Sequence, residues 1–227
     1  MKEVEKWKRY ELTLDGPTDG NPFRDVELSA TFDRNNHSIT VDGFYDRDGK
    51  YKIRYMPEVE GEYTVTTHSN VPELDEKNDN FTVTKASKDN HGPVRVAGKT
   101  HFAYADGTSY IPFGTTAYAW TVQPKEVQEE TLETLKNNNF NKIRMLVFPK
   151  SYSYNEEEPE IYPFEGFLRY KRGANDWIFD AHETGFDYTR PNPKYFQNLE
   201  NNIDKLDKLG IEADLILFSP YDRWGFA

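Results

Sequence analysis

The periodicity of apolar residues changes once along this chain, near residue 109, and that change limits what the sequence can fold into. Before it, short segments such as 26–32 and 63–67 alternate apolar and polar residues, which predicts strands with one buried face. After it, apolar runs alternate with helical patterns, which predicts parallel strands joined by helices. The sequence therefore predicts two units of different architecture.

The first unit, residues 1–88, is predicted to be an immunoglobulin-like β-sandwich. Its strands are separated by turn pairs such as Asp48-Gly49 and Glu60-Gly61, in which glycine accepts the positive φ of a tight hairpin. Residues 89–108 are predicted to be a linker that carries two short strands, at 94–97 and 101–105. The N-terminal half is therefore expected to be all β.

The second unit, residues 109–227, is predicted to be α/β, an incomplete (β/α) TIM-barrel segment with three β/α units. Its strands are expected at 110–115, 142–148 and 211–218, and its helices at 121–138 and 193–209. Asn192 is a good N-cap before Pro193, and Gly210 suits the position after the helix end. An eight-fold barrel takes about 250 residues. Residues 109–227 are too few for a complete barrel. The unit is therefore either a fragment of a barrel or a smaller open sheet.

Composition excludes several classes of function. A net charge of -11 argues against nucleic acid and against an anionic membrane surface as partners. The chain has no cysteine, so thiolate metal sites and cysteine nucleophiles are excluded, and its five histidines lack metal-ligand spacing. We therefore expect no metal and no cofactor. No signal peptide or apolar span is visible, which gives a cytoplasmic location as the expectation.

Candidate binding residues follow the predicted strands, because ligands of parallel α/β folds bind at the carboxyl ends of the strands. Thr116, Tyr118 and Trp120 follow the first strand, and Phe148 and Lys150 follow the second. The third strand is followed by Ser219, Tyr221, Asp222, Arg223 and Trp224. Aromatic faces stack on sugar rings while charged groups bind hydroxyls, so carbohydrate is the expected ligand. The alternative is that these aromatic side chains only pack at the strand ends.

Arg144 lies inside the second predicted strand, between Ile143 and Met145. A buried guanidinium is costly unless a carboxylate pairs with it. Arg144 is therefore predicted either to hold a catalytic carboxylate or substrate, or to pair with a structural Asp or Glu. The predicted substrate-binding residues are Tyr118, Trp120, Arg144, Tyr221, Asp222, Arg223 and Trp224, and no catalytic residue is predicted.

Several ungapped stretches, taken in order, resemble a known family. They are Asp89-Asn90-His91-Gly92-Pro93-Val94, residues 101–108 and 112–120, Lys142-Ile143-Arg144-Met145, and residues 213–226. Together they resemble bacterial glycoside hydrolases with an N-terminal domain of unknown function 5060 and an apiosidase-like or cellulase-like barrel. The resemblance covers nearly the whole chain.

The resemblance implies a retaining barrel whose acid/base and nucleophile glutamates follow the fourth and seventh strands. It implies that this chain is truncated after the third strand and lacks both, and that Arg144 supports the nucleophile. Ser219 stands where a histidine is expected. The chain alone is therefore expected to be inactive, and whether it is an enzyme stays open.

Two functions follow as hypotheses. The chain is either the N-terminal portion of a glycoside hydrolase acting on polysaccharide or oligosaccharide O-glycosidic bonds, or a non-catalytic carbohydrate-binding or scaffolding module. Besides carbohydrate, the expected partners are the missing C-terminal barrel half or a second copy that pairs through an exposed strand edge at 211–218.

Overall fold

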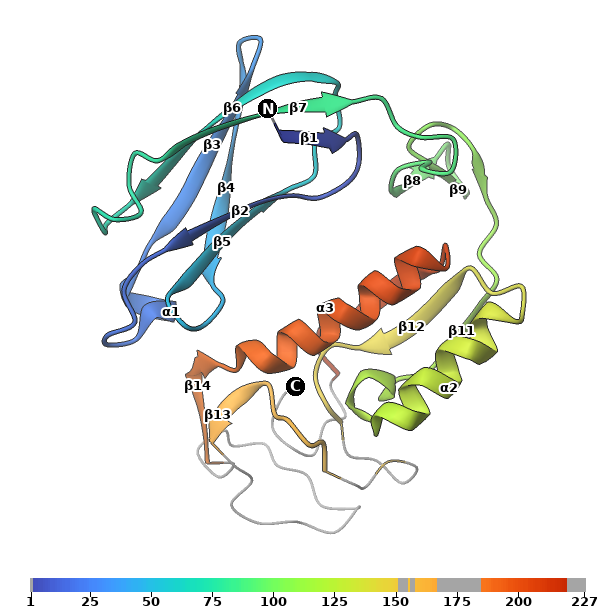
Figure 1. The fold of residues 1–227 in the computed structure, drawn as a ribbon. Coiled ribbons are helices and arrows are strands. Elements are labelled where there is room, and N and C mark those ends of the chain that lie inside the picture. The colour runs from blue at the N-terminus through green and yellow to red at the C-terminus, as the bar shows by residue number, and fades with distance from the viewer. Residues whose placement is uncertain (1, 151–154, 156–157, 167–184, 220–227) are drawn as a thin grey trace. The chain divides into compact units, whose positions relative to one another are not determined.

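The structure is a computed structural model that describes residues 2–150, 155, 158–166 and 185–219 (Figure 1). The chain divides into two compact units, Met1–Ile111 and Pro112–Ala227. The domain limits expected from the sequence, at 88 and 109, stay a prediction. Strands make up 42% of the structure and helices 18%, so the protein is mostly β.

Seven strands of the first unit form one sheet, in the order β1-β7-β6-β3-β4-β5-β2. The strands are β1 (Lys2–Glu5), β2 (Tyr10–Asp15), β3 (Leu28–Arg34), β4 (His37–Tyr45), β5 (Lys50–Tyr55), β6 (Gly61–Ser69) and β7 (Asn78–Thr84), and a short helix α1 (Pro22–Asp25) follows β2. The two edge strands lie close together. Lys2 Nζ of β1 donates to the Glu11 carbonyl oxygen of β2 at 2.6 Å. The sheet is therefore a nearly closed, barrel-like layer (Figure 1).

The predicted immunoglobulin-like β-sandwich is wrong, because these seven strands are hydrogen-bonded into a single sheet rather than two facing ones. Alternation with period 2 reveals only that each strand has one buried face. A sandwich and a curled single sheet share that property. The difference lies in pairings distant in sequence, such as the parallel pair of Lys2 with Phe81, which local pattern does not encode.

Aromatic side chains fill the inside of this sheet. Tyr10 and Phe81 stack with their ring centroids 4.1 Å apart, and Tyr63 stacks on the other side of Phe81 at 5.1 Å. Phe32 meets the edge of the Tyr10 ring at 5.7 Å. The Tyr10 hydroxyl donates to Asp79, and burial, with Asp79 as the second cause, raises the pKa of Tyr10 well above its usual range. The high aromatic content of the sequence therefore supplies this core.

A three-stranded sheet completes the first unit, with strands β8 (Val94–Ala97), β9 (His101–Tyr104) and β10 (Ser109–Tyr110) in the order β10-β9-β8. The segment before it is fastened to the larger sheet. Glu5 Oε1 accepts hydrogen bonds from the Ser87 backbone N–H and the Asn90 amide, both at 2.7 Å. Gly92, at a φ of 73°, lies directly against the indole ring of Trp7.

The second unit contains a three-stranded parallel sheet in the order β11-β12-β15. Its elements are β11 (Gly114–Thr116), a 3-10 turn η1 (Trp120–Val122), α2 (Lys125–Lys136), β12 (Lys142–Leu146), the antiparallel ribbon β13 (Phe164–Gly166) and β14 (Phe186–Pro191), α3 (Pro193–Lys208), and β15 (Glu212–Ile216). Both helices contribute to one hydrophobic cluster with Ile143 and Met145 of β12. The helices thus cover one face of this small sheet.

The predicted incomplete TIM-barrel segment with three β/α units is also wrong. The described part of the second unit holds three short parallel strands, two helices and a two-stranded ribbon, and the described residues of the two units together are mostly β. The apolar runs at 110–115 and 211–218 suggested long buried strands, yet only five residues of the latter pair with a neighbour. The former divides between two sheets, because β10 ends at Tyr110 and β11 begins at Gly114.

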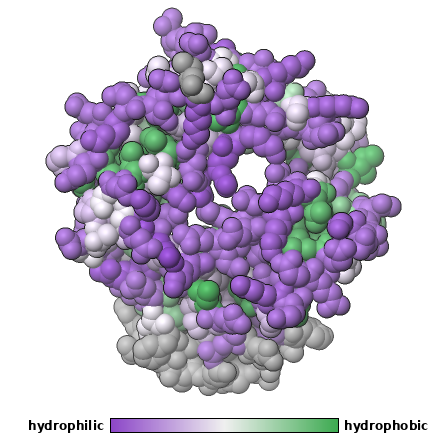
Figure 2. Space-filling view, in the orientation of Figure 1, coloured by the Kyte–Doolittle hydropathy of each residue, from purple (hydrophilic) through white to green (hydrophobic). Residues whose placement is uncertain are grey.

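The predicted ends of helix α3 are confirmed. Asn192 is its N-cap and accepts a hydrogen bond from the Lys194 backbone N–H, and Gly210 adopts a φ of 69° just after its end. Among the described residues, no helix is long and apolar enough to cross a membrane. Figure 2 shows hydrophilic side chains over most of one face of the molecule, with small apolar areas between them.

Replacing Gly92 with alanine tests the contact that fastens the smaller sheet. A Cβ at this position would lie 2.5 Å from Cδ2 of Trp7, while a Cβ at Gly98 would meet nothing within 4 Å although its φ is also positive. Overpacking typically costs about 1–3 kcal/mol. We expect Gly92→Ala to lower the free energy of unfolding by at least about 1 kcal/mol more than Gly98→Ala, in urea titrations followed by tryptophan fluorescence. Equal losses in the two variants would contradict the packing argument.

The carboxylate of Asp106 is expected to titrate unusually low. His91 lies 2.7 Å from this carboxylate, the Thr108 backbone N–H donates to it at 2.8 Å, and together they lower the pKa of Asp106 to about 2. Because the folded-state pKa is depressed, the ionised form stabilises the turn above pH 3.8 and this contribution is lost as pH falls through about 2. The amide shift of Thr108, followed by NMR, should move with a midpoint near 2, and a midpoint near 4 would refute the contact.

Candidate functional site

The candidate site lies at the carboxyl ends of the three parallel strands. In open α/β sheets, ligands bind outside these ends. Tyr118 follows β11, Phe148 and Lys150 follow β12, and Ser219 follows β15. Backbone bonds hold the strand ends together, since the Ala117 N–H donates to the Arg144 carbonyl at 2.9 Å and the Leu146 N–H to that of Tyr118 at 3.0 Å.

A groove of about 610 Å³ opens beside the end of β11. It is lined by Thr116, Ala117, Tyr118, Ala119, Trp120, Gln123, Val127, Thr131 and Asn155. Tyr118, which carries an aromatic ring, is 42% exposed and lines the groove. Gln123 Nε2 donates to Asn155 Oδ1 at 2.8 Å, so two amides are oriented beside this ring. An exposed ring flanked by hydroxyls and amides can bind a sugar by stacking and hydrogen bonding.

Trp120 borders the same groove but is only 3% exposed. Its indole N–H donates to the Gln128 carbonyl at 3.1 Å, and its ring belongs to the hydrophobic cluster of the second unit. The structure therefore brings Tyr118 and Trp120 together, as the sequence suggested. In this conformation, however, Trp120 packs beneath the groove rather than presenting a free stacking face.

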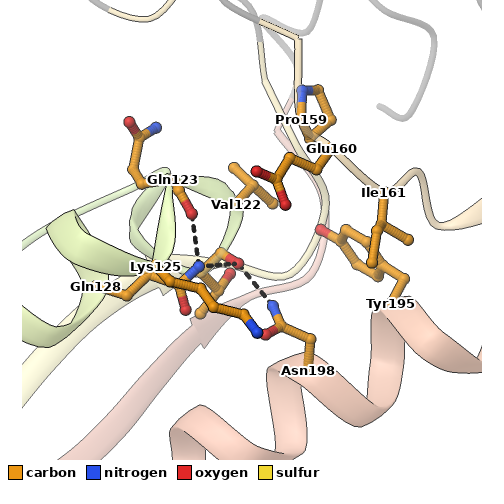
Figure 3. Close-up of a pocket in the computed structure, with 10 residues that line it drawn as sticks. Val122, Gln123, Lys125, Gln128, Pro159, Glu160, Ile161, Tyr195 and Asn198 are labelled. Carbon is orange, nitrogen blue, oxygen red and sulfur yellow. Dashed lines mark hydrogen bonds between the residues drawn. The ribbon is translucent and has the colours of Figure 1, made fainter.

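A small cavity of about 60 Å³ is lined in part by Thr121 and Val122 of η1 (Figure 3). Figure 3 shows Gln128 approaching it from α2 and Tyr195 and Asn198 from α3, while Gln123, just after η1, turns its backbone carbonyl toward Gln128. Gln128 Nε2 donates to the Thr121 carbonyl at 3.3 Å and to the Gln123 carbonyl at 2.6 Å, and Asn198 Nδ2 donates to Thr121 at 2.8 Å. These amides hold the turn that carries the groove residues. Sequence reasoning missed them, because isolated amides belong to no recognised motif.

Arg144 pairs with a carboxylate of the neighbouring strand. Its Nε lies 2.9 Å from Asp214 Oδ2, and Lys142 Nζ reaches the same oxygen at 2.8 Å. Lys142, followed by Arg144, lowers the pKa of the Asp214 carboxyl, against the opposing effect of burial. Thr116, Arg144 and Asp214 occupy one row across β11, β12 and β15. Several roles were left open for Arg144. The structure shows one of them, an ion pair with an Asp of the same sheet, Asp214.

Aromatic rings gather at the ends of β12 and β15. Phe148 stacks on Phe164 of the ribbon at 6.0 Å and on Phe218 at 5.7 Å, and the Phe218 side chain is 66% exposed. Tyr188 packs against Phe164 at 5.0 Å. Of these rings, only Phe148 was expected either to bind sugar or to pack, and it packs against Phe164 and Phe218.

Four predicted binding residues, Tyr221, Asp222, Arg223 and Trp224, lie outside the described residues. Within the described ranges, no group of three or more His, Asp or Glu side chains is arranged to hold a metal ion.

Two comparisons bear on the class of protein. The family described as "Domain of unknown function (DUF5060)" matches residues 3–70. A "putative glycoside hydrolase" from Bacteroides vulgatus is 48% identical over 100% of this chain, with a TM-score of 0.89. This chain spans 43% of the length of that structure's chain. The expected resemblance is thus confirmed for the N-terminal domain and for the likeness to a glycoside hydrolase, and the truncated barrel is unsupported.

More distant solved structures add nothing to the assignment of a protein class. A family 39 glycoside hydrolase from Bacteroides cellulosilyticus is 11% identical, covering 95% of this chain and 32% of its own, with a TM-score of 0.27. A xyloglucanase from Bacteroides ovatus is 13% identical, covering 95% of this chain and 43% of its own, with a TM-score of 0.25. Likenesses this weak carry no argument. No curated protein matches the sequence.

Replacing Asp214 with asparagine tests the ion pairs beside the groove. It leaves Lys142 and Arg144 without their shared anion, so we expect the free energy of unfolding to fall by about 1 kcal/mol at pH 7. Because the folded-state pKa of Asp214 is depressed, the wild-type advantage is complete above about pH 4 and is lost at lower pH. Chemical denaturation of both proteins at pH 7 and pH 3 measures the difference.

Glu212→Gln is the matched control, since it removes a carboxylate from the same strand. Burial, followed by the charge of Asp207, raises the pKa of Glu212, so its ionised form is disfavoured in the fold. This variant should be neutral or slightly stabilising. A loss as large as that of Asp214→Asn would show that strand β15 tolerates no change, and would remove the evidence for the ion pairs.

Proposed function

We propose that this chain acts in glycoside hydrolysis, as the portion of a glycoside hydrolase that binds a polysaccharide or oligosaccharide. The observation that carries the proposal is the 48% identity, over the whole chain, to the glycoside hydrolase-like protein from Bacteroides vulgatus. The groove beside Tyr118 supports it, because its ring, hydroxyls and amides match what a sugar requires. The proposal assigns binding, and no catalytic role, to the described residues.

A stacking role for Tyr118 agrees with its neighbours. The ring is exposed, whereas the aromatic side chains inside the first unit are buried against each other. Gln123 and Asn155 are fixed to each other, so a sugar hydroxyl would meet oriented donors and acceptors with little further loss of side-chain entropy. The net charge of -11 does not oppose a neutral sugar.

The second candidate function is a non-catalytic carbohydrate-binding module in the first unit. A groove of about 650 Å³ favours it, lined by Val26, Glu27, Leu28, Ser29, Asp42, Gly43, His68, Ser69, Asn70 and Asp75. Asp42, Ser29 and His68 stand in one row across β4, β3 and β6. This lining is polar and contains no Phe, Tyr or Trp ring for a sugar to stack on, which makes it the weaker candidate.

Tyr118 variants test the first function. The full chain would be titrated with xylo-, cello-, galacto- and galacturono-oligosaccharides by calorimetry, to find one that binds. Tyr118→Ala should then weaken binding about 10-fold, equivalent to about 1.4 kcal/mol, because the stacking face is lost. Tyr118→Phe keeps the face and should bind within about 2-fold of the wild type.

Two outcomes contradict the assignment. If no oligosaccharide binds, the proposed function fails. If binding survives Tyr118→Ala but is lost in His68→Ala, the ligand occupies the groove of the first unit, and the second candidate replaces the first.

A further inference from the structure

A backbone outlier lies in the turn that follows β1. Trp7 adopts a φ of 67°, in the left-handed region that bulky side chains rarely enter. Such a conformation persists only where the surrounding contacts enforce it, and it is typical of clamps and switch regions. The Trp7 backbone N–H donates to the Pro57 carbonyl at 2.9 Å, and Lys6 Nζ lies 4.1 Å from the centre of the indole ring. The turn is therefore held in a strained shape.

The strap, residues 87–92, lies between β7 and β8 in the chain and is bound to this turn. Glu5 Oε1 accepts hydrogen bonds from the Ser87 backbone N–H and the Asn90 amide, both at 2.7 Å. The same amide donates to the Lys6 carbonyl at 2.9 Å, while Asn90 Oδ1 accepts from the Gly92 backbone N–H at 3.2 Å. Asn90 thus connects the turn to the strap through both its nitrogen and its oxygen.

Charge and close packing add to this contact. The Ser87 backbone N–H, followed by Asn90, lowers the pKa of the Glu5 carboxyl, so the acceptor is ionised at neutral pH. Hydrogen bonds to an ionised group are about twice as strong as neutral ones. Gly92 lies so close to the Trp7 ring that a Cβ there would be 2.5 Å from Cδ2 of the indole. The strap therefore fits the strained turn closely.

The other end of the strap is bound to the small sheet. His91 Nδ1 lies 2.7 Å from Asp106 Oδ2, and the Asp106 backbone N–H donates to the His91 carbonyl at 3.2 Å. Asp106 belongs to the turn between β9 and β10, where the Tyr104 N–H donates to the Thr108 carbonyl at 2.9 Å. The strap therefore joins the turn after β1 to the turn after β9.

We propose that the turn Glu5–Trp7 is a clasp, and that the strap and strands β8, β9 and β10 come loose from it and unfold as one cooperative unit while the seven-stranded sheet stays folded. Strands β8 and β9 have four residues each and β10 has two. A sheet this small is marginally stable by itself. Once the clasp opens, nothing comparable to the aromatic core of the larger sheet holds these strands together.

The packing of the small sheet supports separate opening. Among the described residues, none of β8, β9 or β10 belongs to the buried cluster of the seven-stranded sheet. Val96 and Phe102, which are paired across β8 and β9, are 73% and 51% exposed. Arg95 of β8 also pairs with Glu58, but both side chains are about half exposed, and such pairs contribute little. Regions with few buried apolar contacts open at a lower free energy than a core.

The strain at Trp7 opposes the contacts of the clasp. Opening frees the Trp7 backbone to leave the left-handed region, which favours the open state, whereas the bonds of Glu5 and Asn90 favour the closed state. Two arrangements of one segment with opposing contributions make a switch. The clasp thereby decides whether the small sheet, from which the chain continues into β11, is held or released.

The test is native-state hydrogen exchange of the full chain, followed by NMR. Three backbone amides report on the proposed unit, those of Ser87, Tyr104 and Asp106. The amide of Thr67, which donates to the Lys77 carbonyl at 2.9 Å, reports on the larger sheet. In the wild type the three amides should share one free energy of opening and, after correction for intrinsic rates, exchange at least about 10-fold faster than Thr67.

Glu5→Ala distinguishes cooperative opening from local fraying. It removes the acceptor of the Ser87 amide but contacts neither Tyr104 nor Asp106. All three amides should nevertheless exchange about 10-fold faster, since bonds to a charged group contribute about this much. Glu3→Ala is the matched control, because it removes an exposed carboxylate from the same strand, and it should leave all the rates unchanged.

His91→Ala weakens the strap from its other end. It should accelerate exchange at Ser87 as much as at Asp106, while Thr67 remains the slowest amide, which shows that the larger sheet is still folded. Acceleration confined to Ser87 in Glu5→Ala, or to Asp106 in His91→Ala, would overturn the inference. So would wild-type Tyr104 and Asp106 amides that exchange as slowly as Thr67, because the small sheet would then unfold only with the larger one.

Discussion

The site depends on a buried pair of amides in the second unit. Asn202 of α3 donates from Nδ2 to Gln128 Oε1 of α2 at 2.8 Å, and these side chains are 1% and 6% exposed. Burying an amide without a partner costs about 1–3 kcal/mol, so both are stable here only because each is bonded. Gln128 in turn donates to the carbonyls of Thr121 and Gln123. The turn after β11, and with it the groove, is therefore fixed by two helices.

The sequence predicted most of the individual elements and failed on how they assemble. Alternation located the strands, and Asn192 and Gly210 located the ends of α3, because both signals are local. The sandwich was inferred from the kinds of element alone, and the barrel segment from the kinds of element together with the family resemblance. The single curled sheet instead depends on pairs such as Lys2 with Phe81, and the small parallel sheet on the short pairing of β12 with β15. Such long-range pairing leaves no periodic trace.

The candidate site was predicted in part for the same reason. The rule that ligands meet strand ends led to Tyr118, Trp120 and Lys150, which depend only on where a strand stops. It could not predict that Trp120 would be buried or that Asp214, 70 residues away, would be the partner of Arg144. A signal did exist for one amide, because Asn202 lies on the apolar stripe of Leu199, Ile203 and Leu206. A polar residue on such a stripe needs a buried partner.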